Sequence, residues 1–96
     1  MKEGALGLLE IRGLPYAVAA ADIMCKASPI TLHKLEKTKG GGWMLVMVTG
    51  EVEAVKEALE VGENFARNHS CFIARGFISR MSDGLLDFFP QTSKKD

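Results

Sequence analysis

The sequence predicts an α+β domain with the ferredoxin-like order β-α-β-β-α-β, in which two helices cover one face of a four-stranded sheet and a short C-terminal helix follows. Four short apolar runs have the length of strands, and two longer stretches with helical character separate the outer runs from the middle pair. Three consecutive glycines stand between the two middle runs, where a hairpin would turn. Because this topology supports many unrelated functions, the function has to be inferred from particular residues.

The first strand is predicted over residues 5–12, a short apolar run that Gly13, Leu14 and Pro15 follow. Proline suits the first turn of a helix, so we expect a helix to begin there and to run over residues 16–27. The middle of this helix is nearly all small residues, which allows a close approach to a sheet or to another helix. Pro29 cannot continue the helix and biases Ser28 away from helical geometry.

The two middle strands differ in pattern. Residues 30–38 alternate between apolar and polar, with one slip before Leu35, which is typical of a half-exposed strand. Residues 43–48 are continuously apolar, which predicts a strand that is covered on both faces.

The second helix is predicted to begin at Gly50 and Glu51, with acidic residues in its first turn and basic residues in its last. Gly62 lies inside its apolar face and costs about 1 kcal/mol relative to alanine, so we expect it to allow close packing on the sheet. The last strand is predicted over residues 72–79, a short helix over 84–89 and a polar tail over 91–96. The apolar face of the second helix consists of Ala54, Val55, Ala58, Leu59, Val61, Gly62, Phe65 and Ala66.

Composition limits the classes of function. The chain has 96 residues, which is enough for one domain, and its 12 basic and 12 acidic residues are scattered and give no net charge. This balance argues against a nucleic-acid partner or an anionic membrane surface. We also expect no membrane span, a cytosolic location, and two reduced, buried cysteines at Cys25 and Cys71.

The glycines at 40–42 have two possible roles: a plain hairpin turn, or a loop whose bare backbone amides line a site. They do not match a phosphate-binding loop, because no Lys-Ser/Thr pair follows them and they lead into a strand instead of a helix. Catalysis is not predicted, because His33 and His69 have no evident nucleophile beside them apart from Cys71, two residues after His69. An RNA-binding sheet is also disfavoured, because Trp43 is the only aromatic residue on the corresponding strand.

Three ordered segments together resemble the shell-protein domain of bacterial microcompartments, whose hexameric tiles form the facets of protein-bounded organelles. The resemblance covers residues 4–90 and is greatest toward the propanediol, ethanolamine and choline type of catabolic compartment, which also shows the late Ile78-Ser79-Arg80. The three segments are residues 5–14 (ALGLLEIRGL), residues 20–27 (AADIMCKA) and residues 35–52, from LEK through the glycines to GEV.

The resemblance implies a role for particular residues. Lys26 and Arg80 fall on the hexamer edge, where neighbouring tiles meet, and Gly40, Gly41 and Gly42 fall on the loop around the central pore. Lys37 and Lys39 would add positive charge at the pore entrance. The chain departs from the family pattern at Lys39, a one-residue lengthening of the loop, at Met81, where proline is usual, and at Pro29.

The expected protein is therefore a shell subunit within the cytoplasm and not an enzyme. Its expected partners are five further copies in a hexamer, other shell proteins edge to edge, and small polar or anionic metabolites in the pore, with no metal or cofactor. We expect neighbouring subunits to bury part of residues 17–21 and 43–48. The alternative is a small-molecule-sensing regulatory domain of the same topology, which would form no sheets or tubes when overexpressed.

Overall fold

The computed structural model describes residues 4–38 and 40–79 and confirms the predicted order of strands and helices. The predicted C-terminal helix and tail, together with Lys39, Arg80 and Met81, lie outside the described residues. Within the described part of the chain, no helix has the length and apolar character that a membrane span needs. The elements are β1 (Ala5–Arg12), α1 (Leu14–Ala27), β2 (Thr31–Lys37), β3 (Trp43–Gly50), α2 (Val52–Asn68) and β4 (Phe72–Ser79).

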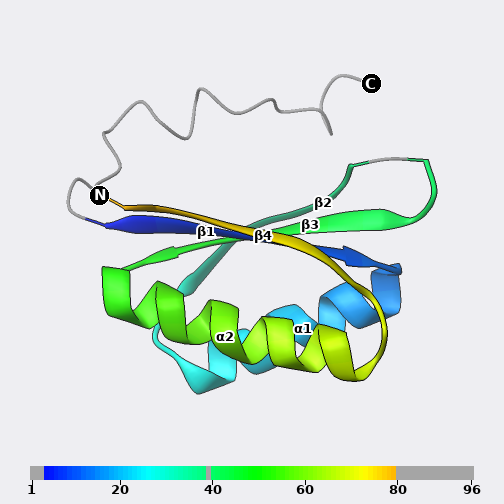
Figure 1. Cartoon of the computed structure of the whole chain (residues 1–96). Helices are drawn as coiled ribbons and strands as arrows, with labels where there is room; N and C mark the ends of the chain where they lie inside the picture. Colours follow the sequence, from blue (N-terminus) through cyan, green and yellow to red (C-terminus); the bar gives the residue numbers. More distant parts are fainter. Residues whose placement is uncertain (1–3, 39, 80–96) are drawn as a thin grey trace.

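The four strands form one antiparallel sheet in the order β2-β3-β1-β4, and both helices lie on the same face of it (Figure 1). The main core lies between this face and the helices, where Leu9 and Ile11 of β1 are fully buried. Since side chains alternate between the two faces of a strand, Leu6, Leu8 and Glu10 lie on the face away from the helices. A smaller apolar cluster on that face contains Leu6, Leu8, Leu45, Met47 and Ile78.

The slip in the β2 sequence pattern corresponds to an irregularity in the sheet. The pairing of β2 with β3 shifts register between Leu32 and Lys34, so His33 is the extra residue of a bulge. Leu35 then pairs with Val46 on the helix-covered side. The bulge therefore returns the apolar side chains of an edge strand to the core.

Small residues set the distance between the layers, as predicted for Gly62. A Cβ atom at Gly62 would lie 2.6 Å from Met24 Sδ of α1 and 2.7 Å from Leu9 Cδ2 of β1. Ala17, Ala20 and Ala21 of α1 are buried within the same core. The small-residue helix thus packs inside its own subunit.

Within the two segments expected to be partly buried by neighbouring subunits, several residues are already buried in the single chain: Ala17, Ala20, Ala21, Met44, Val46, Met47 and Val48. Burial of the remaining residues by neighbouring subunits stays a prediction. A different prediction about burial, that of Cys25, is wrong. Cys25 is exposed, since it lies on the solvent side of α1. Cys71 is buried as expected, and burial raises the pKa of its thiol.

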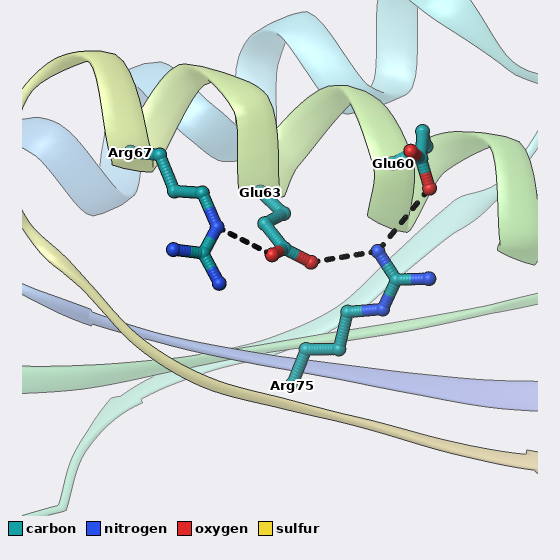
Figure 2. A network of polar contacts seen from close by, with 4 residues as sticks. All are labelled: Glu60, Glu63, Arg67 and Arg75. Atoms are coloured by element: carbon teal, nitrogen blue, oxygen red, sulfur yellow. Dashed lines mark hydrogen bonds and ion pairs between the residues drawn. The ribbon is translucent and has the colours of Figure 1, made fainter.

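The polar face of α2 is joined to the edge strand β4 by the network in Figure 2. Glu63 accepts hydrogen bonds from Arg67 at 2.6 Å and from Arg75 of β4 at 2.9 Å, and Arg75 also lies 3.4 Å from Glu60. The hydrogen bond from Arg67 and the charges of both arginines lower the pKa of Glu63, although partial desolvation opposes them. The four side chains pair their opposite charges with one another, which indicates that the network has a structural role.

Candidate functional site

The glycines form the turn of the β2–β3 hairpin, which extends beyond the part of the sheet that the helices cover (Figure 1). The Thr38 amide donates a hydrogen bond to the Trp43 carbonyl at 3.0 Å and closes the turn. Gly42 has a φ of 86°, a conformation that side-chain-bearing residues rarely adopt. All three glycines are exposed, and a Cβ atom at Gly40 or Gly42 would meet nothing within 4 Å. The turn is therefore open to a partner or a solute.

Two long-range hydrogen bonds connect this turn to β1 and to the start of α1. The Gly13 amide, just before α1, donates to the Gly42 carbonyl at 2.8 Å. The Thr38 hydroxyl donates to Glu10 Oε2, also at 2.8 Å. The glycine turn is thus hydrogen-bonded at both ends, to Glu10 of β1 and to Gly13 at the start of α1.

Lys26 lies in the last turn of α1 and points to solvent, with 75% of its side chain exposed. Its ammonium group is 3.1 Å from the Asp22 carboxylate, one turn earlier, which is the ion pair that the sequence spacing suggests. An exposed pair of this kind stabilises a helix by only a few tenths of a kcal/mol. Fold stability therefore gives no strong reason for a lysine at this position.

The structure places the predicted pore loop and the predicted edge lysine at opposite ends of α1. Gly13, which precedes the helix, is bonded to the glycine turn, and Lys26 lies twelve residues after Leu14. At 1.5 Å per residue the two ends are separated by about 18 Å along the helix. The glycine turn and Lys26 therefore do not form one cluster, and any contacts they make with partners would lie at different ends of the helix.

Apolar side chains are exposed on the first half of α1. Leu14 is 53% exposed and Val18 is 50% exposed, and the two lie one turn apart on the same helix face. Tyr16 is 41% exposed and packs on His69, with ring centroids 5.1 Å apart. Of residues 17–21, Val18 and the half-buried Ala19 remain available to a neighbouring subunit.

Lys37, the described lysine of the predicted pore loop, is exposed at the end of β2, next to the turn. Glu10 was not predicted as a site residue, because its contact with Thr38 spans 28 positions and depends on the strand register. Among residues 4–38 and 40–79, no three His, Cys, Asp or Glu side chains gather in a way that would hold a metal ion.

The described residues thus form a ferredoxin-like β-α-β-β-α-β domain with an open glycine turn at one end of α1 and an exposed lysine at the other. The sequence profile of the BMC domain matches residues 5–81, and the chain belongs to this family.

The chain is similar to proteins named as bacterial microcompartment shell proteins. It is 46% identical over 82 residues to PduK of Citrobacter freundii, a match that covers 85% of this chain and 53% of PduK. It is 44% identical over 68 residues to PduA of Salmonella typhimurium, a match that covers 71% of each chain. The chain therefore spans about half the length of the PduK relative and most of the length of PduA.

A solved structure supports the same assignment. The chain superposes on a microcompartment protein from Desulfitobacterium hafniense with a TM-score of 0.78 and 25% sequence identity. The match covers 88% of this chain and 45% of that one.

Proposed function

We propose that this chain is a structural shell subunit of a bacterial microcompartment, which assembles as a hexamer and tiles edge to edge with other shell proteins in the cytoplasm. The observation that carries this proposal is the separation of the open glycine turn from exposed Lys26 along α1, in a chain of the BMC-domain family. In a ring, the turn would surround the axis and Lys26 would face the neighbouring tile. Arg80 would complete that contact.

The proposed subunit is not an enzyme, and its role in metabolism is to control the passage of metabolites through the shell. Six copies of Gly40, Gly41 and Gly42 would present backbone amides to the axis, and such concentric N–H groups attract anions. Lys37 and Lys39 would add positive charge at the entrance. The proposed solutes are therefore small polar or anionic metabolites. The regulatory alternative receives no support from the relatives, which are named as shell proteins.

Gly41→Leu tests the pore. Gly41 is exposed, and the nearest atoms to a Cβ atom there belong to the Trp43 ring at 3.9 Å, so the substitution fits within the subunit. In a hexamer it would place six leucine side chains in one opening, and we expect growth on the compartment's substrate to slow in cells whose native shell carries the variant. Asn64→Leu, at an exposed position of α2, is the matched control. Unchanged growth with Gly41→Leu would mean that solutes pass elsewhere and that the glycines form only a hairpin turn.

A further inference from the structure

We propose that Glu10 is a specificity-determining residue of the pore, whose carboxylate limits the preference for anions that the lysines and glycine amides create. The inference rests on the proposed function, since it requires the glycine turn to surround a ring axis. In that ring, six Glu10 carboxylates would lie directly behind the six turns.

The strand geometry places Glu10 at the base of the turn. Leu9 and Ile11 are buried beneath the helices, so Glu10 projects from the opposite face of the sheet. Its register partner on β3 is Leu45, two residues after Trp43, where the strand leaves the turn. The Thr38 hydroxyl donates a hydrogen bond to Glu10 Oε2, and Thr38 is the last residue before Lys39 and Gly40. Glu10 is thus adjacent to the loop in space although distant from it in sequence.

The charge of Glu10 is not neutralised by an ion pair within the described residues, where the Thr38 hydroxyl is its hydrogen-bond partner. The other carboxylate nearby on this face, Glu36, lies 3.7 Å from the ammonium group of Lys34. A hydroxyl donor stabilises a carboxylate but leaves its net charge in place. Glu10 therefore opposes the field of Lys37 at the same end of the sheet.

Glu10→Gln tests the effect of the Glu10 charge while leaving the loop in its position. Glutamine retains a carbonyl oxygen that accepts the Thr38 hydrogen bond, so the turn keeps its support and the ring loses six negative charges. Thr38→Val makes the complementary change, since it removes the hydrogen bond and retains the charge. Glu57→Gln, at an exposed position of α2, removes one carboxylate per chain elsewhere on the subunit.

The measurement compares solute uptake into shells that contain this chain and enclose a pyrene-labelled cargo. Iodide and acrylamide both quench pyrene, one as an anion and the other as a neutral molecule, and stopped-flow fluorescence gives the rate for each. We expect Glu10→Gln to raise the iodide-to-acrylamide rate ratio roughly threefold, as Coulomb's law predicts for six unit charges about 10 Å away in water at physiological ionic strength. Glu57→Gln should leave the ratio at the wild-type value.

The outcomes distinguish this inference from the function on which it rests. If shells form and Glu10→Gln leaves the ratio unchanged, the inference is wrong and the shell function stands. If Thr38→Val raises the ratio as much as Glu10→Gln does, Glu10 acts through the position of the loop and the proposed charge effect is overturned. If the subunits assemble without closing a ring, the inference is wrong and the shell function stands. If the chain stays a monomer, both are wrong.

Discussion

Gly62→Val is expected to destabilise the subunit by about 3 kcal/mol, at the upper end of the usual cost of overpacking a core. The added Cβ atom would lie within 2.7 Å of both Met24 and Leu9, and valine adds two methyl groups to it. Met24 and Leu9 are themselves fully buried, so a shift of either side chain has to disturb its neighbours in the core. Small domains are stable by only about 5–15 kcal/mol, so this loss is a large share of the total.

The control for this substitution is Gly76→Val on β4. A Cβ atom there would lie 3.6 Å from Leu8 Cδ1, an ordinary contact, beside an open recess lined by Leu8, Leu45 and Ala74. Valine also suits a strand. Urea unfolding followed by circular dichroism, at one protein concentration, should show a much lower midpoint for Gly62→Val than for Gly76→Val. Equal midpoints would show that the layers separate easily and that Gly62 is not needed for their packing.

If the proposed tiling is correct, Lys26→Asp is expected to abolish extended sheets while leaving each proposed hexamer folded. The side chain is 75% exposed and its pair with Asp22 contributes little, so the cost to the subunit should stay below about 1 kcal/mol even with two acidic residues one turn apart. The expected effect on tiling is large because, in the proposed assembly, the contact would be repeated at every boundary between tiles. Electron microscopy of the purified protein measures sheet formation, and light scattering measures the hexamer.

Lys56→Asp is a closely matched control. Lys56 is also an exposed helix lysine, and it also pairs with an acidic residue on its own helix, Glu53, at 3.8 Å. We expect this variant to form sheets as the unmodified protein does. Sheets of normal appearance from Lys26→Asp, or equal loss in both variants, would show that Lys26 does not have a specific role at the tile edge.

Most of the fold could be predicted from the sequence, because its signals are local. Pro15 and Pro29 mark the two ends of α1, and the slip before Leu35 marks the bulge in β2. The predicted start of α2 at Gly50 is too early, because Gly50 pairs with Ala5 and belongs to β3, and α2 begins at Val52. Acidic residues near a helix start do not reveal where the preceding strand stops pairing.

The candidate site could be predicted only in part, because some of its features depend on contacts between distant segments. The glycine turn and Lys26 were found through the resemblance to the shell-protein family, and their roles in the pore and the edge remain predictions. The contact of Glu10 with Thr38 depends on the register of two strands, and no local pattern contains it. The exposure of Cys25 was missed because cysteine is usually buried, whereas its position on α1 faces solvent.

The oligomeric state in solution tests the shell assignment most directly. Size-exclusion chromatography with multi-angle light scattering, at micromolar concentration, is expected to give a species with the mass of six chains or a larger assembly built from it. Subunits that contact head to tail form a closed ring only if their rotation closes, so negative-stain images of the same fraction should show six-fold rings. Subunits that follow a screw axis would contradict the closed pore, and a stable monomer would contradict the proposed shell function itself.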